Sequence, residues 1–259
     1  MNPGEKMSQF YERTKIATQI VKARKSERES KENTYKFHRS GKEYFYRIGG
    51  LENLFKYLKS LPSNKVLDVG AGTGNASYKI SQMPISKGLD FEITALRNSP
   101  ELKSNFPEKK THITGAESLR GIENKSLAGV IGVNSIAYSL YPKLVAGRID
   151  EVLVDGGVVK ATFALFGESH NYDGSVFNGP EKFIEAFAIL GYDIFFIENK
   201  FFDNDRYDFS RFLNSIVLAI KPGNQNAPSA KELLDLDFDA INNESLDKGR
   251  DCPVFDIKD

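Results

Sequence analysis

The residues of this chain with the clearest chemical potential form a glycine-rich stretch, Lys65–Asn75, which reads KVLDVGAGTGN. An apolar pair, Val66-Leu67, reaches the acid Asp68, and glycines then occupy positions 70, 72 and 74. The apolar residues predict a buried strand, and the SYKISQM that follows predicts a helix. Glycines at such a junction let the backbone turn tightly and approach a ligand without interference from a Cβ atom. The stretch therefore predicts a site for a nucleotide-like ligand.

Two other interpretations of the glycine stretch stay open. The dinucleotide fingerprint GxGxxG, counted from Gly70, would need glycine at position 75, where this chain has Asn75. A structural turn in an unrelated α/β protein would also use glycines, because turns commonly need positive φ angles.

The histidines are the candidates for acid–base chemistry. His170, in GESHNYDG after the predicted fifth strand, is the best-placed general base, and a solvated loop histidine is the alternative interpretation. His112 lies inside a predicted strand, which favours packing or surface exposure. His38 lies in an aromatic segment ahead of the core and could reach the site only if that segment covers it. Scattered histidines and one cysteine, Cys252, predict no metal site.

From Lys65 onward, strand patterns alternate with helix patterns, which predicts a parallel sheet with crossover helices. The expected strands are Val66–Val69, then runs beginning at Phe91, Thr111 and Leu127, then Val158–Leu165, and finally an antiparallel pair, YDIFFIENKFF and FLNSIVLAIKP. Ligands bind beyond the carboxyl ends of parallel strands. We therefore expect Asn134, Tyr138 and Tyr141, which follow the fourth strand, to border the site.

Composition limits the choice of partner. The 259 residues carry 35 basic and 35 acidic side chains, so net charge favours neither nucleic acid nor a membrane surface. Residues 1–59 hold 14 basic and 7 acidic side chains, and residues 224–259 hold 4 and 9. The chain shows no signal-like segment and no apolar run of membrane-spanning length, and its cysteine usage fits a reducing compartment, so we expect a cytoplasmic protein.

The pattern hhDhGxGxG resembles motif I of the Rossmann-like (class I) S-adenosylmethionine (SAM)-dependent methyltransferases. Three later segments, ITALRNSPEL, TGAESL and VLVDGGVVKATF, are similar to further parts of that family, so the resemblance covers about residues 51–222. It implies an α/β fold with a doubly wound, seven-stranded, mostly parallel sheet and an antiparallel last strand. Residues 1–50 would form an N-terminal helical cap, and residues 223–259 an acidic, partly flexible tail.

The resemblance also implies a cofactor, SAM, and a set of residues around it. The cofactor-binding residues would be Asp68, Gly70, Ala71, Gly72 and Thr73 in motif I, Leu96 and Arg97 near the ribose, Ala116 and Glu117 near the adenine, and Asn134 and Tyr46. The catalytic candidates are His170 and Tyr138. The NSIA segment lacks the double proline of enzymes that methylate exocyclic amines of DNA bases, which disfavours that activity. We expect methyl transfer to an oxygen or nitrogen of a small molecule.

Two positions depart from the family pattern. Arg97 stands where an acid normally accepts hydrogen bonds from the ribose hydroxyls, and arginine has only donors. The nearest acids are Glu92 and Glu101. Gly115 replaces an acid that in many relatives binds the adenine amino group. Each lost bond would weaken binding by about 1.5–3 kcal/mol.

These departures leave three alternatives open. Arg97 could serve an anionic ligand, or the chain could be a catalytically silent subunit that supports a partner in a homo- or heterodimer. An RNA methyltransferase would instead use the basic, aromatic N-terminal stretch.

Overall fold

The structure, a computed structural model, describes residues 48–96, 98–139, 141–163, 169–170, 176–177, 179–197 and 215–235. Four of the residues named above, His38, Tyr46, Arg97 and Cys252, lie outside these ranges. The predictions made for them, and for the cap as a whole, therefore stay predictions.

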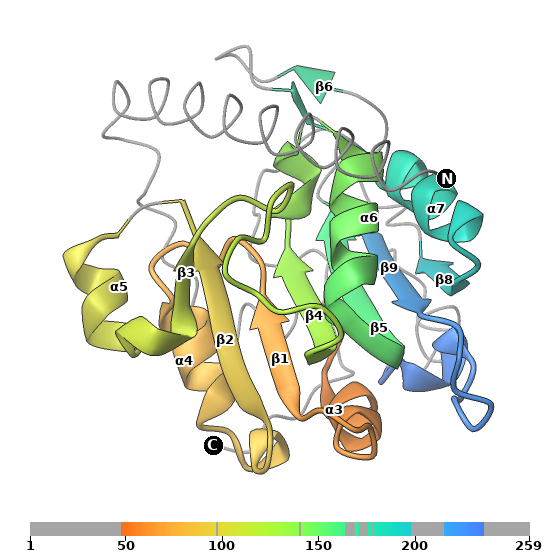
Figure 1. Cartoon of the computed structure of the whole chain (residues 1–259), viewed down its shortest axis with the longest axis horizontal. Helices are drawn as coiled ribbons and strands as arrows, with labels where there is room; N and C mark the ends of the chain where they lie inside the picture. Colours follow the sequence, from red (N-terminus) through yellow and green to blue (C-terminus); the bar gives the residue numbers. More distant parts are fainter. Residues whose placement is uncertain are drawn as a thin grey trace, which may run out of the picture.

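A seven-stranded sheet forms the centre of the molecule, with strand order β3-β2-β1-β4-β5-β9-β8 (Figure 1). The strands are β1 (Lys65–Asp68), β2 (Asp90–Ala95), β3 (Thr111–Ile113), β4 (Leu127–Val133), β5 (Leu153–Phe163), β8 (Asp193–Ile197) and β9 (Ser215–Ile220). Only β9 runs against the other six, since it pairs antiparallel with both β5 and β8. The sheet confirms the predicted doubly wound α/β fold with an antiparallel last strand.

Helices cover both faces of the sheet because successive strand residues point to opposite sides. One face carries Val66 and packs against α3 (Glu52–Leu58), α4 (Asn75–Ser81) and α5 (Pro100–Asn105). The other carries Leu67 and packs against α6 (Pro142–Val152) and α7 (Pro180–Ile189). Short 3₁₀ turns complete the chain: η2 (Pro84–Ser86), η3 (Glu108–Lys110), η4 (Ile136–Tyr138) and η5 (Ala230–Leu233). Val66 and Leu67 are fully buried, as predicted for a central strand.

Two connections differ in detail from the prediction. β5 begins at Leu153, directly after α6, rather than at Val158, because the pairing with β4 jumps over an irregular stretch that contains Gly156 at φ 78°. The expected glycine turn thus lies within the strand. Between β3 and β4, residues 114–126 contain no α-helix. This irregular connection is tied to α6 by backbone hydrogen bonds, from the Lys125 N–H to the Glu151 carbonyl and from the Ser126 N–H to the Val152 carbonyl, and by side chains.

After β9, residues 221–235 pack against the rest of the domain. Ser229 and Glu232 form a capping box at the start of η5, and Leu233 and Leu234 are buried in the same core as α3. Residues 227–234 thus pack against α3, β8 and β9 through Ala227, Ala230, Leu233 and Leu234. The domain boundary at residue 222 stays a prediction. Residues 236–259 lie outside the described residues.

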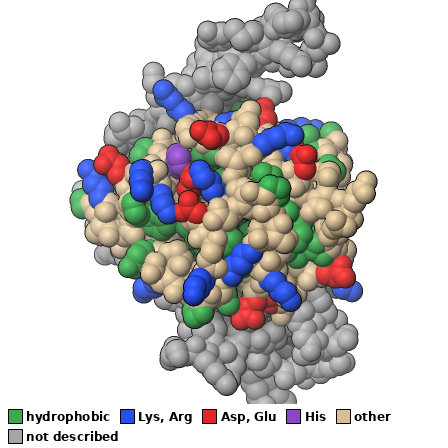
Figure 2. Space-filling model, turned by 60° about the horizontal axis from the view of Figure 1, so that its bottom comes forward, with side chains coloured by type: hydrophobic (Ala, Val, Ile, Leu, Met, Phe, Trp, Pro, Cys, Tyr) green, Lys and Arg blue, Asp and Glu red, His purple; other side chains and the backbone are tan. Residues whose placement is uncertain are grey.

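Within the described residues, no helix is both long and apolar enough to cross a membrane. Figure 2 looks toward the edge of the sheet where β1 begins, and it shows Lys and Arg side chains interspersed with Asp and Glu on that face. The visible surface therefore has the mixed character expected from a net charge of zero.

Candidate functional site

The glycine loop after β1 has a backbone that requires glycine at three positions. Gly70, Gly72 and Gly74 have φ angles of 72°, 63° and 72°, a region that side chains with a Cβ rarely adopt. Thr94 at the end of β2 holds the loop from the side: its Oγ1 accepts from the Gly70 N–H at 2.8 Å, and its carbonyl oxygen accepts from the Ala71 N–H at 2.9 Å. The loop is therefore a fixed feature of the central strand's carboxyl end.

The three glycines differ in what surrounds them. A Cβ on Gly70 would lie 2.7 Å from Cβ of Ser135, and one on Gly74 would lie 3.1 Å from Cδ1 of Ile93, so both glycines are needed for packing. A Cβ on Gly72 would meet no protein atom within 4 Å among the described residues. Gly72 is therefore the one of these three glycines at which an added side chain would meet open space rather than the packed fold.

The backbone around Gly72 also offers hydrogen-bond donors. Among the described residues, the N–H groups of Gly72 and Thr73 donate to no protein acceptor. The Thr73 carbonyl is held by the side chain of Asn105 in α5, at 2.9 Å. A loop fixed at its ends, with two donors left for a partner, is suited to a ligand that carries hydrogen-bond acceptors.

Asp68 lies directly below the loop with its side chain in the face covered by α4. Only 1% of the residue is exposed, and its Oδ2 accepts from the Ser77 hydroxyl at 2.5 Å. Ser77 comes from the first turn of α4, so the bond ties the strand to the helix across the loop. The carboxylate is thereby oriented beneath the glycines.

The ends of the neighbouring strands supply the other predicted residues at this edge of the sheet. Leu96 follows β2 and is half-buried, and Ala116 and Glu117 follow β3, with Glu117 buried. Asn134 follows β4 and is buried at φ 55°, where its Oδ1 accepts from the Thr162 hydroxyl at 3.3 Å. Because β1–β4 are parallel, these residues share the edge of the sheet that carries the glycine loop. Their contact with a cofactor stays a prediction.

The connection that contains Ala116 and Glu117 is held by one arginine of α6. Arg148 donates to the carbonyl oxygens of Ser118 (3.0 Å) and Ile122 (3.1 Å), to Oδ1 of Asn124 (2.8 Å) and to Oε2 of Glu151 (2.7 Å). Nothing in the local sequence pattern marked this arginine as part of the site.

The two catalytic candidates lie in neighbouring segments. Tyr138 ends η4 and is half-buried. His170 belongs to the short strand β6 (Ser169–His170), which pairs with β7 (Val176–Phe177), and β7 lies next to η4. The side chain of His170 lies outside what the structure describes, so its role as a base stays a prediction.

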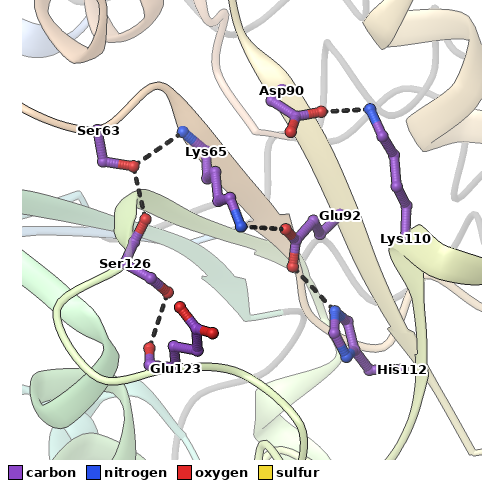
Figure 3. Close-up of polar contacts among 8 residues, drawn as sticks. All are labelled: Ser63, Lys65, Asp90, Glu92, Lys110, His112, Glu123 and Ser126. Carbon is purple, nitrogen blue, oxygen red and sulfur yellow. Dashed lines mark hydrogen bonds and ion pairs between the residues drawn. The ribbon is translucent and has the colours of Figure 1, made fainter.

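Glu92 is engaged in a polar cluster with Lys65 and His112 (Figure 3). Its Oε1 lies 3.0 Å from Nζ of Lys65, and its Oε2 lies 2.9 Å from Nε2 of His112. The hydrogen bond from His112, followed by Lys65, holds the pKa of Glu92 below its usual range. Glu92 is therefore committed to β1 and β3, and it is not the acid that could replace Arg97 at a ribose. His112 has the packed role expected for it.

Sequence reasoning missed Thr94, Ser77 and Arg148, all of which brace the site. Each acts on a residue at least nine positions away, so short-range patterns carry no signal for them. Among the described residues, no cluster of three or more His, Cys, Asp or Glu side chains could hold a metal ion.

No protein-family model matches the chain, and no curated protein does. Solved structures do resemble it. A Listeria monocytogenes protein assigned as a SAM-dependent methyltransferase is 14% identical over 66% of this chain and 99% of its own, with a TM-score of 0.48. A geranyl diphosphate methyltransferase in complex with GPP and sinefungin is 11% identical (65% and 75% covered, TM-score 0.49), and the cyclase SpnF is 16% identical (67% and 81%, TM-score 0.44).

Proposed function

We propose that this chain binds SAM at the glycine loop and transfers its methyl group to an oxygen or nitrogen of a small molecule. The observation that carries the proposal is the position of Gly72. It has a positive φ angle and open space where a Cβ would lie, directly beyond the central strand of the sheet. Together with the resemblance of the loop to motif I, this arrangement favours SAM over a purely structural turn.

The residues at this edge fit the chemical groups of SAM. The N–H groups of Gly72 and Thr73 can donate to its amino-acid carboxylate, while the Asp68 carboxylate suits its ammonium group. The half-buried Leu96 and Ala116 offer apolar contact for the adenine ring. Glu117 follows Ala116 and is buried. We expect it to help fix the connection beside the adenine rather than to bind the ring directly.

When bound, SAM supplies a methyl group activated by a positively charged sulfur. The protein's task is then to align an acceptor with that methyl group, and alignment alone can lower a barrier by about 7–11 kcal/mol. Tyr138 and Asn134 lie after β4, where they can orient an acceptor. An acceptor hydroxyl would have to lose a proton during transfer, and His170 would take it.

The test is a calorimetric titration of the full chain with SAM and with S-adenosylhomocysteine, repeated for Gly72→Val. We expect micromolar binding by the wild type and no measurable binding by the variant, because the valine side chain would occupy the ligand's space. NAD serves as the comparison ligand for the dinucleotide alternative.

Gly88→Val is the matched control. Gly88 also has a positive φ, 90°, and a Cβ there would meet nothing within 4 Å among the described residues, but it precedes β2 at the opposite edge of the sheet. Both variants should therefore lose similar stability, on the order of 1–2 kcal/mol from backbone strain, and only Gly72→Val should lose SAM. Equal SAM affinity in the two variants would place the cofactor elsewhere.

A further inference from the structure

β5 contains a lysine that the proposed chemistry does not use. Lys160 is fully buried, and its ammonium group donates to the carbonyl oxygens of Gly50 at 2.7 Å and Gly49 at 3.3 Å. A buried ammonium is strongly disfavoured unless it is paired or hydrogen-bonded. Burial accordingly lowers the pKa of Lys160 to about 8, although the negative charge of Asp235 opposes that shift.

Asp235, from the C-terminal segment, acts on the same short stretch of chain. Its carboxylate oxygens accept from the backbone N–H groups of Glu52, at 2.9 Å, and Asn53, at 2.7 Å, which begin α3. The side chain of Asn53 in turn donates to the carbonyl oxygen of Leu234 at 2.9 Å. A Cβ on Gly50 would lie 2.4 Å from Oδ2 of Asp235, so this approach depends on glycine.

The stretch held in this way, Ile48–Asn53, therefore has a cation on one side and an anion on the other. Lys160 binds its carbonyl groups and Asp235 binds its N–H groups, so each ion satisfies the backbone atoms of matching polarity. Both contacts are long-range in sequence: Lys160 lies 110 positions from Gly50, and Asp235 lies 183 positions from Glu52.

The lysine lies on the same face and at the same level of the sheet as Asp68. Asp68 pairs with Ile131 of β4, and Ile131 pairs with Lys160 of β5, so the three residues form one row across parallel strands. Two strand spacings separate the ends of that row, about 10 Å. The Gly49–Gly50 turn, bound to Lys160, thus lies over the face of the sheet that carries the candidate cofactor carboxylate.

We propose that Lys160 and Asp235 are positioning residues for the cofactor: they fix the Gly49–Gly50 turn and the start of α3 over the face of the sheet that carries Asp68. The proposal rests on the proposed function for its ligand. It makes cofactor affinity depend on the C-terminal segment, although that segment supplies no ligand contact. It also assigns a role to a buried charge that stability alone does not require.

The test compares the full-length wild type with Lys160→Met and Asp235→Asn. SAM affinity is measured by calorimetry, and hydrogen exchange by mass spectrometry on the peptide that covers residues 48–55. We expect both variants to bind SAM at least tenfold more weakly and to exchange the amides of residues 49–53 at least tenfold faster. If Lys160→Met does not fold, the near-isosteric Asp235→Asn still decides the result.

Lys221→Met is the matched control. Lys221 also donates to two carbonyl oxygens, those of Asp150 (2.6 Å) and Leu153 (3.1 Å), and lies 3.4 Å from an Asp150 carboxylate oxygen. It should lose stability and keep SAM affinity. Wild-type affinity in Lys160→Met, or an equal loss in Lys221→Met, would overturn the proposal. If the wild type itself binds no SAM, the proposed function fails, and unchanged exchange in both variants would then overturn the positioning role separately.

Discussion

Replacing Arg148 with methionine would test whether one side chain holds the connection between β3 and β4. That connection contains two residues with positive φ, Leu119 at 42° and Lys125 at 51°. Such angles cost non-glycine residues about 1–2 kcal/mol each. Strained backbone persists only where tertiary contacts hold it, and Arg148 of α6 supplies three of them, to Ser118, Ile122 and Asn124; its fourth contact, with Glu151, lies within α6.

The expected loss follows from the environment of each contact. The two bonds to backbone carbonyls are partly buried and contribute about 1 kcal/mol each. The contacts with Asn124 and Glu151 are exposed and add a few tenths of a kcal/mol each. The sum is roughly 2–3 kcal/mol, which for a domain of this size lowers Tm by roughly 4–12 °C.

Urea unfolding followed by circular dichroism measures the loss, and Arg120→Met provides the control. Arg120 lies in the same connection, but its side chain is exposed, so its replacement should change the free energy of unfolding by less than about 0.5 kcal/mol. SAM affinity should fall about tenfold in Arg148→Met and stay constant in Arg120→Met, since Ala116 and Glu117 lie in the released connection. Equal stability of the two variants would refute the reasoning.

Two further predictions concern Glu92 and Arg97. Glu92→Gln should destabilise the fold by about 1–2 kcal/mol at pH 7. Because the folded-state pKa of Glu92 is depressed, its contribution is present above the ordinary pKa of 4.5 and disappears as pH falls through the folded value; urea unfolding at pH 7 and pH 3.5 should show the wild-type advantage shrinking, and a constant difference would contradict this. Arg97→Asp should tighten SAM binding about tenfold or more in calorimetry by restoring an ionised acceptor, whereas a loss of SAM affinity would reject an adapted ribose site.

The parts of the fold that sequence predicted are those with a local signal. The strand at Val66, the helix with Leu54 and Phe55 on one face, and the glycine loop all follow from the spacing of residues a few positions apart. The parallel order of the strands follows in turn from the alternation of strand and helix. The burial of β1 follows from the same alternation, because β1 is the middle strand of the five parallel neighbours β3-β2-β1-β4-β5 and helices cover both faces of the sheet.

The bracing of the site could not be predicted in this way. Thr94 binds Gly70 from 24 positions away, and Arg148 reaches Ser118 from 30. Threonine in a strand and arginine in a helix are both ordinary residues at their positions. Their partners are backbone atoms, which every residue carries, so residue type alone cannot identify them.

The role of Lys160 could be predicted in part from the sequence. A strand buried on both faces normally consists of apolar residues, so a lysine within LVDGGVVKATF already conflicts with its surroundings. That conflict predicts a partner, because an unpaired buried ammonium would destabilise the fold by several kcal/mol. The identity of the partner requires the fold, since the carbonyl groups come from before α3 and the opposing charge, Asp235, from beyond β9. A charged residue in a strand that is otherwise apolar therefore indicates a contact with a residue distant in sequence. Here the contacts of Lys160 connect both ends of the described chain, and Lys160 lies in the same row across the sheet as Asp68.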